Sequence, residues 1–363
     1  MFFKNFIDIL KKDNHEILCT GRDYREAKEL AKIKKIDIKT IGKHGGDNKY
    51  EKLKASTERA FLLSSIINSF NPDLTVSFSS PEAARISYGL GIKHYVFNDS
   101  PHATAVARLT IPLVDRLFCP WIIPIKEWTK FGLVKSKITT YKALDPIVWI
   151  KRELENNNDL EILKLKKKLK IEEGKKIVLI RPEEVKASYI ADKNVKKSIE
   201  LIDGVVNNFS DKYNILILAR YKDQIDFYKN RFEKKSGTRI IETVTDGILL
   251  LKLADLFIGA GGTMSAEAAL IGKPVISITP INFHVENYLI KIKLVKKIRN
   301  SNILNKSIKK ILSNDDNDDN KQIENKNEIA FKNQSSYQDK INRISQRIIA
   351  KMDDPIEKFK KFL

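Results

Sequence analysis

Short apolar runs alternate with segments of helical periodicity along most of this 363-residue chain. The apolar runs predict strands at residues 16–19, 74–77, 94–97, 116–119, 176–180, 214–218, 256–258 and 274–277. Helices are predicted between them, at about residues 2–12, 22–34, 50–69, 81–90, 103–112, 125–130, 159–169, 192–208, 222–234, 246–252 and 264–271. This alternation is typical of α/β proteins, in which helices cover both faces of a parallel sheet.

The alternation runs through the chain twice, with a break near residues 145–175. We therefore expect two Rossmann-like domains, residues 1–145 and 146–312, whose parallel sheets face each other across a cleft. The hinge is expected at residues 145–149. Residues 313–363 are expected to form a polar linker, rich in Asp and Asn, followed by a C-terminal helix that crosses back to the first domain.

A glycine-rich turn follows the predicted strand at 256–258 and leads directly into a helix. Gly261 and Gly262 let backbone approach a ligand without Cβ clashes. Thr263 then opens a helix whose N-terminus offers N–H groups and a positive dipole end to a phosphate. The alternative is that these glycines only permit a tight turn between strand and helix.

This segment resembles the C-terminal half-site of GT-B-type enzymes, which include nucleotide-sugar glycosyltransferases and UDP-N-acetylglucosamine 2-epimerases. The resemblance implies that Gly261, Gly262 and Thr263 receive the diphosphate, and that Glu267 on the next helix holds the ribose. It also implies a nucleotide-sugar as substrate, with a UDP-linked one among the options, and no separate cofactor.

Two further strings narrow the family. Tyr-Val-Phe-Asn-Asp-Ser-Pro-His-Ala at 95–103 follows Ser-Phe-Ser-Ser-Pro-Glu-Ala-Ala-Arg at 77–85, and Ile-Arg-Pro-Glu stands at 180–183. Together they resemble DUF354, a prokaryotic and mostly archaeal family of uncharacterised proteins related to the glycosyltransferases and 2-epimerases. The resemblance runs over most of residues 1–300 and implies a GT-B-like fold.

Polar residues follow two predicted strands of the first domain, where ligands of open α/β sheets bind. His102 titrates near neutrality and is the predicted general base, with Asp99 beside it to orient it or bind a sugar hydroxyl. Glu82 is the other carboxylate predicted to act in catalysis. The residues predicted on the sugar or acceptor side are Ser79, Ser80, Asn98 and Ser100. For Ser80, a plain helix cap before Pro81 is the alternative.

In the second domain, Arg181 and Arg220 follow two successive strands. Guanidinium groups in this position can pair with a diphosphate through two hydrogen bonds, so both arginines are predicted to bind the nucleotide. Their alternative is an ordinary surface position. Asp246 precedes a helix and is expected to cap it. The histidines are too dispersed to indicate a metal site, and none is expected.

Glycosyl transfer is the favoured function, acting in surface glycan or glycoconjugate synthesis. The alternative is 2-epimerisation. The 2-epimerases use additional acidic residues in the first domain, and the candidate carboxylates near the predicted site are only Glu82 and Asp99, so transfer is favoured. A non-catalytic nucleotide- or glycan-binding protein is the other alternative. It is favoured by the opening Met-Phe-Phe-Lys, which already lies in the first helix where related chains begin with a strand. A start upstream of Met1 would restore that missing strand.

The formal net charge of +20 predicts attraction to anions. The lysines are scattered over helix faces, and no aromatic–basic interleaving of the RNA-binding kind occurs, so specific nucleic-acid binding is not expected. No apolar run approaches the roughly 18 residues of a membrane span, and the N-terminus lacks a signal-peptide core. Two cysteines predict neither a disulfide framework nor a metal site. We expect a cytoplasmic protein, with contact to an anionic membrane surface left open.

Overall fold

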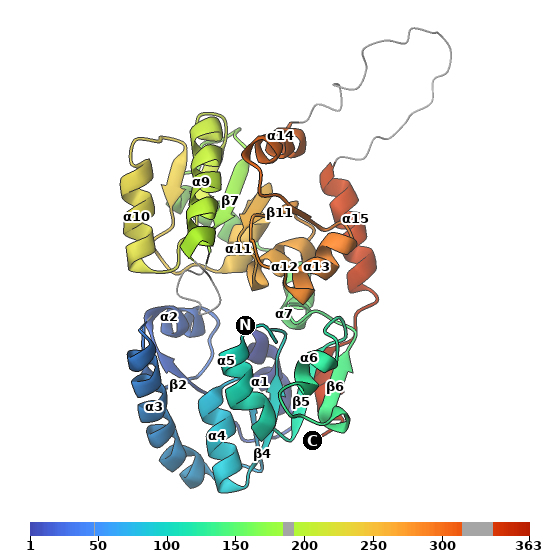
Figure 1. Ribbon diagram of the computed structural model, residues 1–363. Helices are drawn as coiled ribbons and strands as arrows, with labels where there is room; N and C mark the ends of the chain where they lie inside the picture. Colours follow the sequence, from blue (N-terminus) through green and yellow to red (C-terminus); the bar gives the residue numbers. More distant parts are fainter. Residues whose placement is uncertain (47, 184–191, 314–336) are drawn as a thin grey trace, which may run out of the picture.

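The computed structural model describes residues 1–46, 48–183, 192–313 and 337–363. Two α/β bodies lie one above the other and are connected through α7 (Ile147–Glu155) (Figure 1). We call them the N-terminal domain, which holds β1 to β6, and the C-terminal domain, which holds β7 to β12. Their strands are parallel throughout, which confirms the predicted α/β fold with parallel sheets.

The C-terminal domain contains one six-stranded sheet in the order β12-β11-β10-β7-β8-β9. The strands are β7 (Ile177–Arg181), β8 (Asn214–Ile217), β9 (Thr238–Ile240), β10 (Leu256–Gly259), β11 (Val275–Ser277) and β12 (Val295–Lys297). Their side chains alternate between two apolar clusters, so that Val178 and Ile180 face one side of the sheet while Leu179 faces the other.

Helices cover both faces of this sheet. One face is covered by α9 (Asp192–Phe209), α10 (Lys222–Phe232) and α14 (Ser301–Leu312). The other is covered by α8 (Asp159–Lys168), α11 (Gly247–Leu253), α12 (Thr263–Leu270) and α13 (His284–Lys291). This doubly wound arrangement brings the loops after all six strands to one edge, where ligands of such sheets bind.

The N-terminal strands form two sheets. β3 (Leu74–Ser77), β4 (Lys93–Phe97), β5 (Arg116–Pro120) and β6 (Ile138–Tyr141) pair in chain order, while β1 (Thr20–Asp23) and β2 (Lys39–Lys43) form a separate pair. The strand predicted at residues 16–19 is wrong, because that segment is irregular and β1 begins at Thr20. β1 reads Thr-Gly-Arg-Asp, which has no apolar pattern to reveal it.

Helices of the N-terminal domain pack around these sheets. They are α1 (Phe2–Lys12), α2 (Arg25–Ile33), α3 (Lys49–Phe70), α4 (Pro81–Leu90), α5 (Thr104–Thr110) and α6 (Lys126–Thr129), with 3-10 turns at Ile111–Leu113 and Lys135–Lys137. The core on one face of the four-stranded sheet is aromatic: the rings of Phe97 and Phe118 stack with centroids 5.0 Å apart, and α1 adds Phe2 and Phe6.

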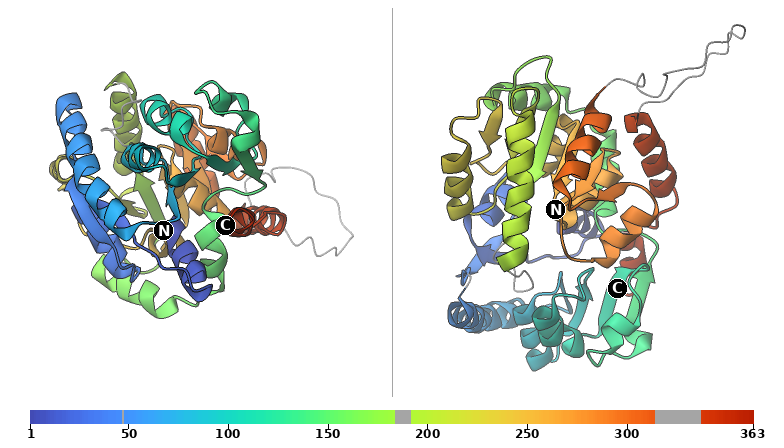
Figure 2. Two further views of the ribbon diagram at one scale, coloured as in Figure 1. Left: turned by 90° about the horizontal axis from the view of Figure 1, so that it is seen from below. Right: turned by 45° about the horizontal axis from the view of Figure 1, so that its top comes forward.

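The C-terminal segment links the two domains. α15 (Tyr337–Ile349) packs on α12, where the Ser345 hydroxyl donates to the carbonyl of Leu270. α16 (Pro355–Lys360) then returns to the N-terminal domain, where Phe359 contacts Phe6 and Phe118. Figure 2 shows this segment, in red, along the side of the molecule. The Asp-rich stretch of the predicted linker lies within residues 314–336, outside the described residues. Among the helices described, none is long and apolar enough to cross a membrane.

Candidate functional site

The glycine-rich turn between β10 and α12 has an open outer side. Gly261 and Gly262 adopt φ angles of 88° and 86°, a left-handed conformation that favours glycine. A Cβ at Gly261 would lie 2.8 Å from the ring of Phe283, whereas one at Gly262 would meet no described atom within 4 Å. Thr263 is exposed, and no described side chain caps the start of α12. The turn therefore presents a helix N-terminus to whatever occupies this space.

His102, from the N-terminal domain, contacts the wall of this turn. It lies in the loop between β4 and α5, and its ring centroid is 4.6 Å from that of Phe283, which precedes α13 in the C-terminal domain. Since Phe283 also borders Gly261, one aromatic side chain separates the predicted base from the predicted phosphate turn. Burial, together with the nearby His284, lowers the pKa of His102 to about 4. The imidazole is thus neutral at pH 7, as a general base requires.

The loop around His102 is organised by its own polar side chains. Asn98 is buried, and its Oδ1 accepts a hydrogen bond of 2.7 Å from the backbone N–H of Ser100. The Ser100 hydroxyl donates to Oδ1 of Asp99 at 2.7 Å. Burial raises the pKa of Asp99 above its ordinary value. Three of the predicted residues therefore form a single hydrogen-bonded turn at the end of β4.

Two residues behind Asp99 were not predicted as part of the site. Tyr141 ends β6, and its hydroxyl donates to Oδ1 of Asp145, which is only 3% exposed. Oδ2 of Asp145 has no hydrogen-bond partner within the part of the chain that the structure describes. Burial, and next the charge of Asp99, raise the pKa of Asp145 well above its ordinary value. Burial and the negative charge of Asp99 both favour the protonated form of Asp145. Nothing in the sequence indicates Asp145 as a site residue, because β6 is not among the predicted strands and residues 145–149 are expected to form a hinge.

The predicted residues after β3 have structural roles. Ser79 adopts a φ of 56°, and its hydroxyl donates to the carbonyl of Phe97 at 3.2 Å, which ties β3 to β4. Ser80 caps α4 by accepting from the N–H of Ala83 at 3.3 Å, the alternative that the sequence left open. Ser79 and Ser80 therefore shape this edge of the sheet.

Glu82 is committed to a buried ion-pair cluster. It is 2% exposed, with Oε1 2.6 Å from Nη2 of Arg22 and 2.7 Å from the hydroxyl of Ser56, and Oε2 3.7 Å from Arg59. Burial alone would raise the pKa of Glu82, but the Ser56 hydrogen bond and the Arg22 charge outweigh it and lower the pKa. A carboxylate whose pKa is lowered and whose oxygens are occupied by these partners is poorly suited to donate a proton. We correct the catalytic prediction for Glu82: its partners lie on β1 and α3, and it holds them to α4.

The two predicted arginines lie at the same sheet edge as the glycine turn, at different distances from it. Arg181 pairs in register with Gly259, directly beside the turn, and its Nη1 donates to the carbonyl of Leu218 at 2.7 Å. Arg220 follows β8, one strand further away, and its guanidinium carbon lies 5.6 Å from the ring centroid of Tyr221. Arg181 is thus the better placed of the two to reach a group at the turn.

Glu267 lies in the interior, where it joins α12 to the helix between the domains. Only 9% of it is exposed, and its Oε1 accepts a hydrogen bond of 2.8 Å from Nε1 of Trp149 on α7. Burial raises the pKa of Glu267 to about 7. Removing this side chain would therefore also disturb the contact between α12 and α7, because Trp149 would lose its acceptor. The ribose role of Glu267 stays a prediction.

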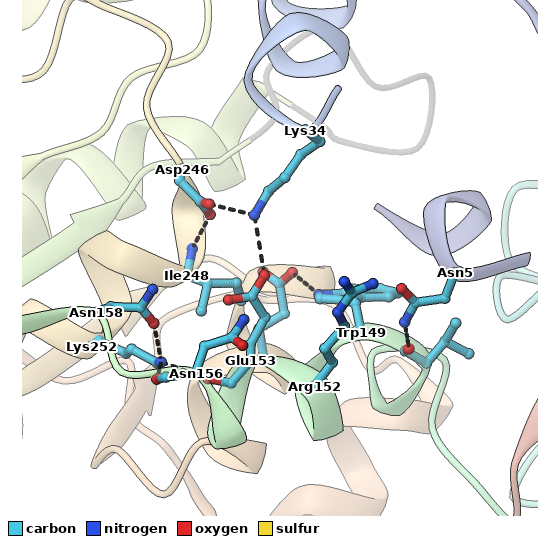
Figure 3. Close-up of polar contacts among 12 residues, drawn as sticks. Asn5, Lys34, Trp149, Arg152, Glu153, Asn156, Asn158, Asp246, Ile248 and Lys252 are labelled. Carbon is cyan, nitrogen blue, oxygen red and sulfur yellow. Dashed lines mark hydrogen bonds and ion pairs between the residues drawn. The ribbon is translucent and has the colours of Figure 1, made fainter. Parts of the chain in front are cut away.

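Polar contacts close to Trp149 hold the two domains together (Figure 3). Lys34, which ends α2, pairs with Glu153 of α7 at 3.2 Å and with Asp246 of the C-terminal domain. Asp246 also caps α11, as predicted, by accepting from the N–H of Ile248 at 3.0 Å. On the other side of α7, the side chain of Asn5 donates to the carbonyl of Val148. The relative placement of the candidate loops depends on these contacts.

Several solved structures have a similar fold. The UDP-GlcNAc 2-epimerase of Neisseria meningitidis, bound to UDP-GlcNAc, gives a TM-score of 0.67 at 15% identity and covers 98% of this chain and 92% of its own. The UDP-GlcNAc 2-epimerase of Methanocaldococcus jannaschii, in complex with UDP-GlcNAc and UDP, gives a TM-score of 0.67 at 15% identity. That match covers 86% of this chain and 90% of the epimerase chain. Anabaena HepE in complex with UDP-glucose gives a TM-score of 0.59 at 12% identity, and the match covers 99% of this chain and 94% of the HepE chain. These similarities establish a GT-B-type fold.

Sequence comparison identifies the family. The uncharacterized protein MJ0665 of Methanocaldococcus jannaschii is 28% identical over 294 residues, which cover 80% of this chain and 82% of that protein. The family model described as "Protein of unknown function (DUF354)" matches residues 1–339, so this chain belongs to the DUF354 family.

Proposed function

We propose that this protein binds a nucleoside diphosphate sugar where its two domains meet, with the diphosphate at the turn of residues 261–263. The proposal rests on the position of Phe283, whose ring contacts His102 of the N-terminal domain and also borders Gly261 of the glycine turn. A ligand at the turn would lie within one side chain of the polar loop at the end of β4. The similar solved structures contain UDP, UDP-GlcNAc or UDP-glucose, which favours a UDP-linked sugar.

The proposed reaction is transfer of the sugar to an acceptor hydroxyl, in the synthesis of a surface glycan or glycoconjugate. The acceptor oxygen attacks the anomeric carbon, the bond from that carbon to the diphosphate oxygen breaks, and His102 takes the hydroxyl proton. The start of α12 and the guanidinium of Arg181 would stabilise the charge that develops on the leaving diphosphate. Asp99, Asn98 and Ser100 would position the sugar or the acceptor.

A second candidate, 2-epimerisation of the donor sugar, is favoured by the coupled acids Asp99 and Asp145. That chemistry needs carboxyl groups in the first domain, and a raised pKa suits a proton donor at pH 7. The engagement of Glu82 in its ion pairs leaves one fewer carboxylate for such a reaction, which favours transfer.

Incubation with UDP-GlcNAc and with UDP-glucose, followed by proton NMR, distinguishes these functions. A transferase releases UDP in step with a glycosylated product when an acceptor is present. An epimerase converts the donor to its C2 epimer without any acceptor. Binding of the donor with no conversion, across a panel of lipid-linked and soluble glycan acceptors, would contradict both reactions and leave a non-catalytic binding protein.

A further inference from the structure

Three helices lie side by side on the outer surface of the N-terminal domain, with α4 packed between α3 and α5 (Figure 1). They expose large apolar side chains to solvent. Phe61 on α3 is 76% exposed, the highest value among the large apolar residues of the described chain. The others that matter here are Tyr50, Leu53, Tyr88 and Leu109. We call this surface the α3–α5 face.

The exposed apolar residues of α3 form an ordered stripe. Tyr50, Leu53 and Phe61 are spaced by three and eight residues, which places them on one side of the helix. Leu63 and Ile67 lie on another side of the helix and are buried in a cluster with Ile86 of α4. α3 therefore has two apolar sides, of which only one is used by the fold. An apolar stripe in water is unfavourable, and its concentration on one face marks an interaction surface.

The exposed charge of α4 and α5 is positive. Arg85 on α4 and Arg108 on α5 are exposed, whereas Glu82 on α4 is buried in its own ion pairs and α5 has no carboxylate. On α3, the exposed cations Lys49 and Lys54 stand beside the exposed carboxylates Glu51 and Glu58. Apolar and cationic side chains interleaved on one surface suit a lipid bilayer with anionic headgroups, because it offers both an apolar layer and phosphates. A nucleic acid would satisfy the cations only.

We infer that the α3–α5 face binds the surface of an anionic lipid bilayer. Phe61, Tyr88 and Leu109 enter the headgroup region, while Arg85 and Arg108 contact lipid phosphates. α4 and α5 begin directly after the loops that hold Ser79, Ser80 and residues 98–102, so the face adjoins the predicted acceptor side. If the proposed glycosyl transfer holds, its acceptor is then anchored in a membrane. The membrane-anchored acceptor rests on the proposed function, whereas bilayer binding does not.

Co-sedimentation of the full chain with vesicles tests this inference without any nucleotide. Binding is expected to phosphatidylcholine vesicles that contain phosphatidylglycerol, not to phosphatidylcholine alone, and to weaken as salt screens the charges. The double variant Arg85→Gln, Arg108→Gln should bind about 30-fold more weakly, since each cation near an anionic surface is worth about 1 kcal/mol. The matched control Lys164→Gln, Lys167→Gln on α8 changes the net charge equally and should keep the affinity.

A second pair of variants tests the apolar contribution. Phe61→Ser with Tyr88→Ser should lower the affinity at least about 10-fold, whereas Leu160→Ser, on the 70%-exposed Leu160 of α8, should not. Equal losses in the controls, or binding indifferent to phosphatidylglycerol, would overturn the inference. So would light scattering that shows a dimer which Phe61→Ser makes monomeric, because the face would then bind a second copy. Nucleotide affinity, measured separately, reports on the proposed function alone.

Discussion

Burial shifts the pKa values of two residues near the candidate site in opposite directions. It lowers the pKa of His102 to about 4 and raises the pKa of Asp145, because in each residue burial disfavours the charged form. The polar loop at 98–102 could be predicted because several polar residues follow a strand, where ligands of open α/β sheets bind. Phe283 and Asp145 could not be predicted as neighbours of that loop, because each comes from a distant part of the chain and neither stands in a pattern that indicates a site.

Replacing Asp145 should flatten the pH dependence of stability. The folded-state pKa of Asp145 is raised, so its contribution is fully present below the unfolded pKa and is lost as pH rises toward the folded one. Each unit of the difference is worth about 1.4 kcal/mol. Between pH 5 and pH 8 the wild type should therefore lose more stability than Asp145→Asn, as measured by urea unfolding. Exposed Asp73→Asn is the control, and parallel curves for the wild type and Asp145→Asn would contradict the assignment.

Replacing His102 should affect turnover with little effect on binding. If a transfer activity is found, His102→Ala should lower kcat by about 10²–10⁴-fold while nucleotide affinity stays within a few fold. Because the pKa of His102 is lowered to about 4, the wild-type rate should stay level from pH 8 to pH 6 and fall only in more acidic solution. Exposed His15→Ala is the control. Unchanged turnover would reduce His102 to a packing residue against Phe283.

In the six-stranded sheet, the central strands could be predicted from the sequence and the edge strands could not. The helix predicted at 81–90 matches α4, and the apolar runs matched β7, β8 and β10 at the centre of their sheet. β9 and β12 were missed, and both are three-residue edge strands of that sheet. An edge strand has one neighbour and is partly exposed, so its sequence carries a weaker apolar pattern. In the four-stranded sheet the edge strand β6 was also missed, whereas the other edge strand, β3, was predicted at residues 74–77.

The glycine turn offers a prediction at the level of one element. Gly262→Ala should weaken UDP binding at least about 10-fold in calorimetry, because its methyl group would occupy the open side of the turn and strain a positive φ. Gly132→Ala is the matched control: Gly132 has a φ of 93°, and a Cβ there also meets no described atom within 4 Å. Both variants should lose similar stability. Equal nucleotide affinity in the two would place the ligand elsewhere.

At the scale of the whole molecule, the two domains are held together by contacts that could not be predicted from the sequence. The predicted alternation indicated two domains, but neither spacing nor composition showed that Lys34 would reach Asp246, or that Trp149 would hold Glu267. Such contacts join residues more than a hundred positions apart, so no local pattern in the sequence indicates them.

Removing the link at Lys34 should destabilise the assembled molecule. Lys34 is 14% exposed and neutralises two carboxylates, so Lys34→Ala should lower the free energy of unfolding by about 1–3 kcal/mol. The control lies on the same helix: Lys28, 48% exposed, pairs only with Asp23 among the described residues, and Lys28→Ala should cost less than about 1 kcal/mol. Denaturant unfolding measures the stability of both variants. Equal losses of stability would show that Lys34 does not hold the two domains together.

Thermal unfolding of the full chain with a panel of nucleotides tests whether a nucleoside diphosphate sugar binds where the two domains meet. At a ligand concentration 100 times the dissociation constant, binding should add about 2.7 kcal/mol to the stability of the folded state. We expect that increase with UDP, UDP-GlcNAc or UDP-glucose, and not with the nucleoside alone. No response to any nucleoside diphosphate or its sugar conjugates at millimolar concentration would contradict the claim.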